Sequence, residues 1–443
     1  MVIKYSEEGK IKWAEGIGGT YIKSVTETAD GGYIVGGYFN SSSIDLGNGI
    51  SLTNKGSINS YDGMIIKLDK IELPNPTVIQ AQRIGGEKDD YIKSIAKCID
   101  GGYIVGGSFC SNSIDLENGV SLTNKGNRDG MIIKYSNIGE VEWIQGIGGT
   151  DDEIIKSVIT TNDGGYIAVG YYKSKVIELK NGVELRNSTV FGKYYYNGMI
   201  IKYSSDGEAE WAKAIGGISN DYIDTVAATS DGGYIVGGGF ESSRIDLGNG
   251  IILTQKSSGI ADGMVIKYSS DGKAEWARVI EGDRHDEINS VAECSDGGYI
   301  VGGRFVSNYI DIGNGISLTN KSGSQAYSDG MIIKYDAEGE VEWAEEIGGS
   351  SNDEITSVTE TTDGGYIVGG YFQSSNIDLG NGINLTHKLN WDGMVIKYNV
   401  EGEVEWAKVI GGTSNDCVNS VTETADGGYI VGGYFQSSSI DLG

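Results

Sequence analysis

The segment that begins at Asp353 has the pattern of two short strands joined by a tight turn. Residues 353–362 are rich in β-branched side chains, and Val358 stands between polar neighbours, as on a half-buried strand. Asp363-Gly364-Gly365 follows and supplies the positive φ angles that a hairpin turn needs. The apolar residues 366–372 then form the second strand of the predicted pair.

A second pair of strands follows in the same repeat. Residues 394–398 read Met-Val-Ile-Lys-Tyr, a turn follows at Glu401 and Gly402, and residues 403–407 form the next strand. No helical periodicity accompanies these segments. We therefore predict four antiparallel strands per repeat, named A to D in chain order.

The four-strand pattern recurs along the whole chain. Asp-Gly-Gly-Tyr-Ile begins at Asp30, Asp100, Asp163, Asp231, Asp296, Asp363 and Asp426. A Met-Ile/Val-Ile-Lys segment begins at Met1, Met64, Met131, Met199, Met264, Met331 and Met394. The 396 residues from Asp30 to Asp426 contain six intervals, so the mean repeat is 66 residues. The core must therefore be shared among repeated units.

Repeats of four antiparallel strands are typical of β-propeller blades, whereas a parallel β-helix uses much shorter coils. Residues 1–19 supply only strands C and D, and residues 416–443 supply only strands A and B, so the two chain ends complete one blade. We predict an all-β fold, a single seven-bladed β-propeller domain over residues 1–443, closed by this two-plus-two clasp.

Two side-chain patterns keep step with the repeat. A large ring in strand D is predicted to fill the gap between blades; it recurs at Trp13, Trp143, Trp211, Trp276, Trp343 and Trp406, and Gln80 replaces it in the second repeat. Strand C lysines beside strand D glutamates predict cross-strand charge pairs, although their register stays open. These residues are Lys67, Lys134, Lys202, Lys267, Lys334 and Lys397 with Glu142, Glu210, Glu275, Glu342 and Glu405.

Several motifs together resemble a known repeat family. They include the segments 329–335 (DGMIIKY), 339–344 (GEVEWA) and 377–382 (IDLGNG), and the pattern covers essentially the whole chain. In these features the chain resembles the bacterial β-propeller repeat family often labelled SBBP. The resemblance implies part of a secreted or surface-attached bacterial protein, so we expect an extracellular or cell-surface location. It brings no catalytic residues to transfer.

Charge narrows the classes of partner. The formal net charge is -28, with 62 Asp and Glu against 34 Lys and Arg. Binding to phosphate backbones depends on Lys and Arg, so nucleic acid and anionic membranes are poor candidates. No apolar run has spanning length, so we expect no membrane insertion. No leader precedes Met1, which already lies inside a repeat, so an export signal would lie upstream.

The chain offers little material for catalysis. Cys98, Cys110, Cys294 and Cys417 form no Cys-x-x-Cys pair, and we expect isolated thiols. His285 and His387 are the only histidines and lie in different repeat contexts, which disfavours a His-based metal centre or a nucleophile–His pair. No acidic pair breaks the repeat symmetry as a glycosidase site should. We therefore predict a protein that is not an enzyme.

One face of the predicted propeller is elaborated. The D-to-A and B-to-C connections share it, and the first B-to-C connection runs over about residues 41–61. Within this connection, the apolar alternation on both sides of Gly-Asn-Gly in residues 44–52 predicts an extra hairpin. Long loops on a rigid frame are the usual place for binding residues, so this face is the predicted site.

A carboxylate stands four residues before the Ser or Thr of strand A in six repeats. These residues are Asp90, Glu153, Asp221, Asp286, Asp353 and Asp416, with Thr20 in the first repeat. We favour a structural role in which each accepts backbone N–H bonds. The alternative is a Ca²⁺ site near the axis, although no loop has EF-hand spacing. No other cofactor is expected.

Tyrosines are the main candidates for ligand contact. The end of strand B varies among the repeats as Tyr38, Ser108, Tyr171, Gly239, Arg304, Tyr371 and Tyr434, and the third repeat adds Tyr194, Tyr195 and Tyr196. Exposed tyrosines suit sugar stacking or protein contact, and packing of a loop on its blade is the alternative. The tyrosines of this series and Arg304 are the predicted binding residues.

The functional hypothesis is a non-catalytic, monomeric display module that contacts protein or glycan through its long-loop face. The alternatives are Ca²⁺-dependent carbohydrate recognition and, on acidity alone, a glycan-cleaving enzyme.

Overall fold

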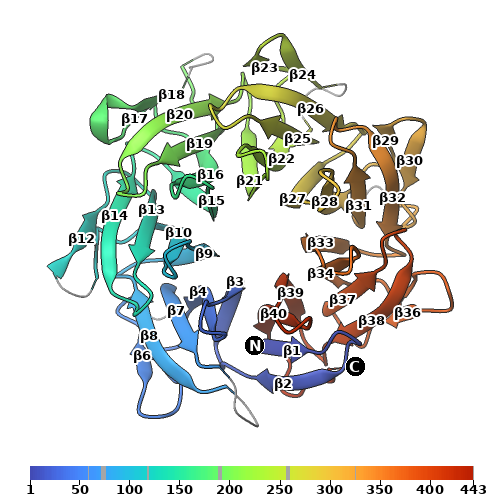
Figure 1. Cartoon of the computed structure of the whole chain (residues 1–443), viewed down its shortest axis with the longest axis horizontal. Coiled ribbons are helices and arrows are strands. Elements are labelled where there is room, and N and C mark those ends of the chain that lie inside the picture. The colour runs from blue at the N-terminus through green and yellow to red at the C-terminus, as the bar shows by residue number, and fades with distance from the viewer. Residues whose placement is uncertain are drawn as a thin grey trace. The chain divides into compact units, whose positions relative to one another are not determined.

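The computed structural model of the chain is all-β and has the architecture of a seven-bladed β-propeller with four antiparallel strands per blade (Figure 1). It describes residues 1–57, 59–70, 76–116, 119–187, 192–255, 260–324 and 326–442. The chain divides into two compact units: unit 1 contains Met1–Ile3 and Trp13–Ile218, and unit 2 contains Lys4–Lys12 and Ser219–Gly443. Within the described ranges, no helix has the length and apolar character needed to cross a membrane.

Unit 1 contains three complete four-stranded sheets, each ordered A, B, C and D. Their strands are β3 (Thr20–Glu27), β4 (Tyr33–Phe39), β7 (Asp62–Leu68) and β8 (Val78–Ile84); β9 (Asp90–Lys97), β10 (Tyr103–Phe109), β13 (Asp129–Tyr135) and β14 (Val141–Ile147); and β15 (Glu153–Thr160), β16 (Tyr166–Tyr172), β19 (Asn197–Tyr203) and β20 (Ala209–Ile215). The A strands β3, β9 and β15 lie side by side (Figure 1).

Unit 2 repeats the arrangement in three further sheets. Their strands are β21 (Asp221–Ala228), β22 (Tyr234–Phe240), β25 (Asp262–Tyr268) and β26 (Ala274–Ile280); β27 (Asp286–Glu293), β28 (Tyr299–Phe305), β31 (Asp329–Tyr335) and β32 (Val341–Ile347); and β33 (Asp353–Glu360), β34 (Tyr366–Phe372), β37 (Asp392–Tyr398) and β38 (Val404–Ile410).

The seventh sheet combines the two chain ends, as predicted. Its order is β2-β1-β40-β39, in which the strands are β2 (Ile11–Glu15), β1 (Val2–Tyr5), β40 (Tyr429–Phe435) and β39 (Asp416–Glu423). Strands from opposite ends of the sequence are therefore neighbours in one hydrogen-bonded ladder.

Small hairpins occupy the B-to-C connections, which confirms the one predicted within residues 44–52. They are β5 (Ser43–Asp45) with β6 (Ser51–Thr53), β11 (Ser113–Asp115) with β12 (Ser121–Thr123), β17 (Val176–Glu178) with β18 (Glu184–Arg186), β23 (Arg244–Gly248) with β24 (Ile251–Thr254), β29 (Tyr309–Gly313) with β30 (Ile316–Thr319), and β35 (Asn376–Asp378) with β36 (Asn384–Thr386). A short 3-10 helix, η2 (Lys180–Gly182), lies between β17 and β18.

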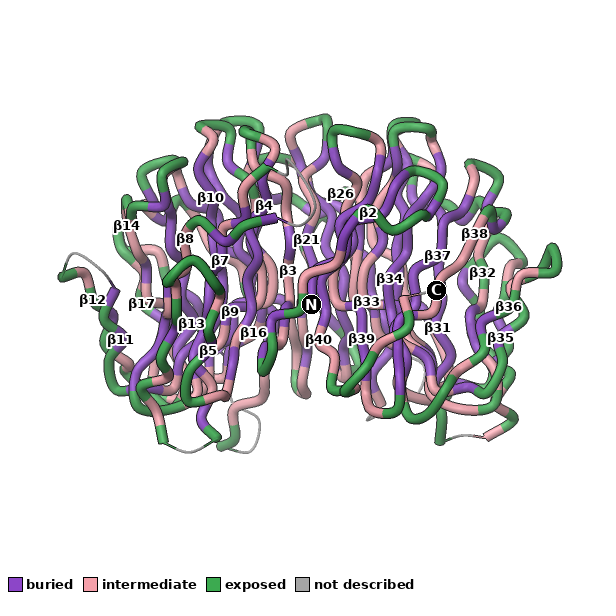
Figure 2. The backbone as a smooth tube through the Cα atoms, turned by 90° about the horizontal axis from the view of Figure 1, so that it is seen from below, coloured by how far each residue is buried: buried purple, intermediate pink, exposed green. Residues whose placement is uncertain are grey.

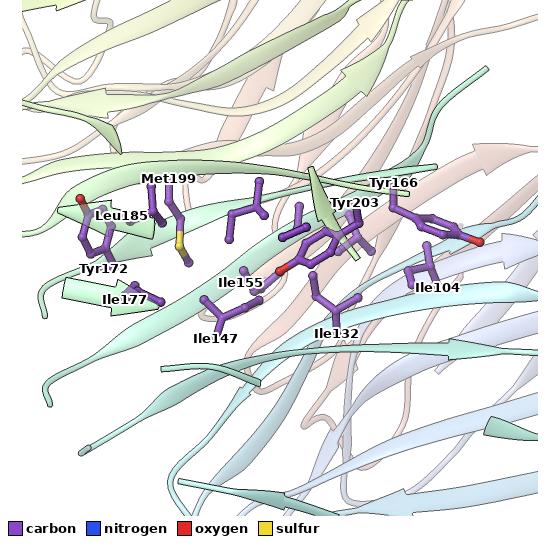
Figure 3. Close-up of a cluster of buried hydrophobic side chains, with 14 of the residues drawn as sticks. Ile104, Ile132, Ile147, Ile155, Tyr166, Tyr172, Ile177, Leu185, Met199 and Tyr203 are labelled. Atoms are coloured by element: carbon purple, nitrogen blue, oxygen red, sulfur yellow. The ribbon is translucent and has the colours of Figure 1, made fainter. Parts of the chain in front are cut away.

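The core lies between neighbouring sheets. Figure 3 shows one such cluster in unit 1, where Ile104 and Ile132 of one blade meet Tyr166, Met199 and Tyr203 of the next, and all five side chains are buried. Burial follows the strands, whereas the turns are exposed (Figure 2). Because each cluster takes residues from two repeats, neither repeat has a complete core by itself.

The strand D tryptophans fill the gap between blades, as predicted. The Trp143 ring lies so close to Gly207 of the next blade that a Cβ there would be 2.5 Å from it. Its Nε1 donates a hydrogen bond to the Ser205 carbonyl at 3.2 Å. In the second repeat, Gln80 occupies the same place against Gly139. A glycine in the C-to-D turn therefore accepts the large side chain of its neighbour.

A buried lysine connects three strands of each blade. Lys134 is 1% exposed, and its Nζ donates hydrogen bonds to Asp100 in the A-to-B turn at 2.7 Å and to Glu142 of β14 at 2.9 Å. It also donates to the Tyr135 carbonyl at 3.0 Å. The equivalent ion pairs are Lys4–Asp426, Lys67–Asp30, Lys202–Asp163, Lys267–Asp231, Lys334–Asp296 and Lys397–Asp363.

The ladder register explains the glutamate contact that the sequence left open. Lys134 pairs with Trp143 and Tyr135 pairs with Val141, so Glu142 is the extra residue of a β-bulge. A bulge re-aims its side chain, and here the carboxylate reaches the lysine. The predicted Lys–Glu pairs are thus confirmed. The aspartate partner was not anticipated.

The number of carboxylates on each lysine predicts different sensitivities. Lys12 stands in the blade of Lys4 where Glu142 stands in the blade of Lys134, so replacing Asp426 leaves Lys4 without a carboxylate partner among the described residues. We expect Asp426→Asn to lower the free energy of unfolding by about 2 kcal/mol and Asp100→Asn by about 1 kcal/mol. Urea denaturation measures both values. Equal losses would contradict the assignment.

Candidate functional site

Buried carboxylates fix the loops at the long-loop end of the blades. Asp90 is fully buried, and its Oδ1 accepts hydrogen bonds from the N–H groups of Cys110 and Ser111 at 3.0 and 3.1 Å. Its Oδ2 accepts hydrogen bonds from the Gly86 N–H at 2.8 Å and the Ser111 hydroxyl at 2.6 Å. One side chain therefore holds the D-to-A loop against the start of the B-to-C connection.

The same acid and serine are bonded in the other repeats that carry the carboxylate. The pairs are Glu153–Ser174, Asp221–Ser242, Asp286–Ser307, Asp353–Ser374 and Asp416–Ser437. In the first repeat, the Thr20 hydroxyl instead donates to the Ile17 carbonyl at 2.6 Å. These bonds support the structural role for the carboxylates. Ca²⁺ binding stays a prediction, and the described part of the chain contains no group of three or more His, Cys, Asp or Glu able to hold a metal.

A second buried acid at the start of strand C was not anticipated from the sequence. Asp129 accepts a hydrogen bond from the Lys125 N–H at 2.8 Å, which ties down the far end of the B-to-C connection. Burial raises the pKa of Asp129 to about 6. Burial also raises the pKa of Glu153 to about 7, and the nearby charge of Asp129 adds to this shift. Each repeat thus places two acids close together at this end of the blade.

Tyrosines of unit 1 form a cluster at the same end. The Tyr38 ring at the end of β4 stacks on Tyr21 of β3 with centroids 5.2 Å apart, and it meets Tyr91 of β9 edge-on at 4.9 Å. Tyr61, just before β7, lies 5.3 Å from Tyr38 and 5.6 Å from Tyr91. All four side chains are half-buried. The cluster spans two neighbouring blades.

Three lysines join this cluster from the bulge positions of the A strands. In β9 the ladder passes from Ser94 opposite Gly106 to Ile92 opposite Gly107, so Lys93 is the extra residue. Lys23 and Lys156 hold the same position in β3 and β15. Since a bulge residue makes no ladder pair, the backbone places few demands on its side chain.

We call the resulting cavity the tyrosine–lysine pocket. It has a volume of about 350 Å³, and its walls include Tyr38, Tyr61, Tyr91, Lys93, Lys156 and Tyr171. Arg128, which immediately precedes β13, completes the wall. Contributions come from all three complete sheets of unit 1.

The cations of the pocket lie over the aromatic rings. Lys93 Nζ is 4.9 Å from the Tyr91 centroid and 5.2 Å from that of Tyr38. The Arg128 guanidinium is 5.6 Å from Tyr91, and Lys156 is 5.8 Å from Tyr171. Burial lowers the pKa of Lys93 to about 7, and the positive charges of Lys23, Lys156 and Arg128 add to this effect. The pocket is therefore a locally positive region in a strongly acidic protein.

Two carboxylates border the tyrosines. The Asp89 carboxylate accepts a hydrogen bond from the Tyr61 N–H at 3.0 Å. The Asp152 carboxylate accepts one from the Tyr196 hydroxyl at 2.9 Å, and the Tyr196 ring contacts Tyr171 with centroids 5.4 Å apart. Both acids therefore position aromatic residues of the cluster.

The predicted binding residues fall into separate places. Tyr38 and Tyr171 line the pocket, and Tyr196 supports it from behind. Tyr194 and Tyr195 are half-buried in the third B-to-C connection and are not part of the pocket wall.

Arg304, Tyr371 and Tyr434 belong to unit 2. There Arg304 lies 3.1 Å from Glu287 and 3.6 Å from Glu354. The Tyr371 hydroxyl donates to Glu354 at 2.6 Å, and its ring stacks on Trp391. Tyr434 is half-buried opposite Cys417. Arg304 is thus neutralised within the protein.

Sequence reasoning missed the pocket lysines, although a signal was present. The residue before the Ser or Thr of strand A is Lys23, Lys93 and Lys156 in unit 1, and Asp224, Asn289, Thr356 and Asn419 in unit 2. This position varies in charge while its neighbours stay nearly constant. Comparing the repeats at strand A as well as at the end of strand B would have revealed it.

Comparisons with known proteins give limited information. No protein family model matches the chain. The regulatory protein FlaEY of Caulobacter vibrioides is 26% identical over 159 residues, which cover 36% of this chain and 16% of FlaEY. An uncharacterized WD repeat-containing protein of Acanthamoeba polyphaga mimivirus is 23% identical over 411 residues, which cover 79% of this chain and 30% of the viral protein. The chain thus spans less than a third of either relative.

Two solved structures resemble the chain weakly. A protein of unknown function from Bacteroides caccae has a TM-score of 0.36 and 11% identity, covering 78% of this chain and 93% of that one. The WD40 domain of Pan2 from Neurospora crassa has a TM-score of 0.43 and 10% identity, covering 94% of this chain and 89% of that one. Neither likeness bears on function.

The buried acids predict how stability depends on pH. Burial raises the pKa of Asp286 to about 7 and that of Asp353 to about 6, despite hydrogen bonds that lower both. The stability from a raised carboxyl pKa is present below the unfolded value of about 4 and is lost as pH rises through the folded value. Burial opposes the lowering at Asp163 in its turn, but bonds from Thr161 and Lys202 outweigh it and lower its pKa to about 2.

That turn contribution is present above about pH 4 and is lost as pH falls toward 2. We therefore expect the melting temperature to be highest near pH 5, to decline toward pH 8 and to fall steeply below pH 4. Differential scanning calorimetry across this range tests the expectation, with Glu153→Gln flattening the decline above pH 5. A melting temperature that rises from pH 5 to pH 8 would contradict it.

The hydrogen bonds of the strand A carboxylates also predict the response to calcium. Because the carboxylate of Asp90 already accepts four hydrogen bonds, millimolar Ca²⁺ or a chelator should change the melting temperature by less than about 1 °C. Thermal melts with Mg²⁺ as the control measure the shift. Stabilisation that grows with Ca²⁺ concentration would instead support the metal alternative.

Proposed function

We propose that the protein is a non-catalytic binding module whose ligand enters the tyrosine–lysine pocket of unit 1. The observation that carries the proposal is the pocket itself, in which half-buried tyrosines and cations from three neighbouring sheets surround about 350 Å³. Concave sites with aromatic walls and a few convergent polar groups are typical of ligand recognition. The pocket also lies among the D-to-A and B-to-C connections, the loops expected to carry a site.

Recognition fits the pocket better than chemistry does. The neighbouring carboxylates of Asp89 and Asp152 accept hydrogen bonds from the Tyr61 N–H and the Tyr196 hydroxyl, so both serve to position rings. Tyrosine rings offer large contact area at a low cost in side-chain entropy. These features favour a binding surface for a glycan or a protein. A place on a bacterial surface or in a secreted protein is part of the proposal and depends on the repeat resemblance.

Arrays of glycans and of surface proteins test this function. We expect the intact chain to bind at least one class of probe, and Tyr38→Ala or Tyr91→Ala to weaken that binding at least tenfold, about 1.4 kcal/mol or more, because the rings supply contact area. Tyr434→Ala is the matched control, since Tyr434 holds the repeat position of Tyr38 in unit 2. Unchanged binding in the unit 1 variants, or an equal loss in the control, would overturn the proposal.

A further inference from the structure

We infer that the tyrosine–lysine pocket selects a short sugar that carries a carboxylate. The inference deepens the proposed function and rests on it. Its basis is the unusual charge of the pocket, the difference between units 1 and 2 at equivalent positions, and the aromatic walls around the cations.

The charge of the pocket is opposite to that of the protein. Acidic residues exceed basic ones by 28 over the chain, yet Lys23, Lys93, Lys156 and Arg128 gather at one place. Like charges at close range repel, and burial makes this repulsion stronger. An arrangement of this kind is stabilised when a negative group binds among the cations.

Lys93 is the centre of this arrangement. The charged and titratable groups that face it are Lys23 of β3, Tyr38 of β4, Arg128 before β13, Lys156 of β15 and Tyr91 on its own strand. Asp89 and Cys110 act on Tyr91 rather than on Lys93 directly. Within the described ranges, no carboxylate forms an ion pair with Lys93. A ligand carboxylate would supply the missing partner.

Unit 2 shows what the same positions become when no external anion is needed. There the bulge residues are Asp224, Asn289, Thr356 and Asn419, none of them basic. Arg304 lies between Glu287 and Glu354 and is therefore neutralised internally. Unit 1 carries Tyr91 where unit 2 carries Glu287. The uncompensated cations are thus a property of unit 1.

Size and surroundings favour a short acidic sugar. The overall charge of -28 repels a long polyanion, whereas a ligand with one carboxylate meets mainly the local field of the pocket. Tyrosine rings pack against the apolar faces of sugar rings, and their hydroxyls offer hydrogen bonds to sugar hydroxyls. An acidic peptide would satisfy the cations but would make less use of the stacked rings, so it is the competing outcome.

Binding of a carboxylate should also move a proton. The pKa of Lys93 is lowered to about 7 in the free protein, and a bound carboxylate would raise it. At pH 7.5 the complex should therefore take up a fraction of a proton from buffer. Affinity should be constant below pH 7 and should fall as pH rises from 7 to 9, because Lys93 is then neutral in the free protein.

Titration calorimetry of the full chain provides the test. The probes are a disaccharide ending in glucuronate, the same disaccharide with that carboxylate converted to an amide, and a hexapeptide of Asp and Glu. Measurements at pH 7.5 in phosphate and in Tris reveal proton uptake. We expect the glucuronate probe to bind at least tenfold more tightly than either of the others, with proton uptake.

Variants connect the result to Lys93. Lys93→Met should weaken binding of the glucuronate probe about tenfold and abolish proton uptake, whereas Lys93→Arg should retain the preference for glucuronate over its amide. Lys97→Met is the matched control, because Lys97 is an exposed lysine on the same strand, and it should bind like the unmodified chain. Thermal melts establish that each variant is folded.

Each outcome decides between the alternatives. Equal binding of the glucuronate and amide probes, tighter binding of the hexapeptide, no effect of Lys93→Met, or no binding of any probe would each overturn the inference. If array binding is lost in Tyr38→Ala but unchanged in Lys93→Met, the binding module stands and the acidic ligand is wrong. If the arrays show no binding in the unmodified chain, both proposals fall.

Discussion

The buried lysine of strand C is the interaction on which each blade depends. A lysine ammonium such as that of Lys134, almost wholly removed from solvent, is tolerated because oxygen acceptors surround it. Asp100 reaches it from the A-to-B turn, and a Cβ at Gly102 would lie 2.7 Å from its Nζ. The Gly-Gly pair is therefore required twice. The first glycine, Gly101, has φ of +84°, and the second leaves room for the lysine.

The two ends of a blade are thus fixed by opposite charges. At the A-to-B end, a buried cation gathers carboxylates from a turn and a bulge. At the other end, a buried carboxylate such as Asp90 gathers backbone N–H groups and a serine hydroxyl. Since the B-to-C connection starts at one such acid and ends at another, its ends are held while its middle is free to vary in length. This is the frame that holds the tyrosine–lysine pocket.

Much of this fold could be predicted from the sequence because the chain states the same pattern seven times. Strand order, the shared terminal blade and the contact of Trp143 with the next blade follow from repeat spacing and residue type. The bulges do not follow, because alternation with a period of two does not identify the residue that the ladder skips. Both Glu142 and Lys93 are such residues. Hence the Lys–Glu register stayed open, and the pocket lysines were missed.

The bulge in strand A explains how near-identical repeats carry different surfaces. A residue paired in the ladder or packed between sheets, such as Ile92 or Ile95, is constrained by neighbours on both sides. The residue in the bulge is constrained by neither, so lysine, aspartate, asparagine and threonine all occur there while the blade stays the same. Variation confined to this position changes the charge of the surface without changing its geometry. The contrast between Lys93 and Asn289 is of this kind, and it places specificity at the position that the fold itself uses least.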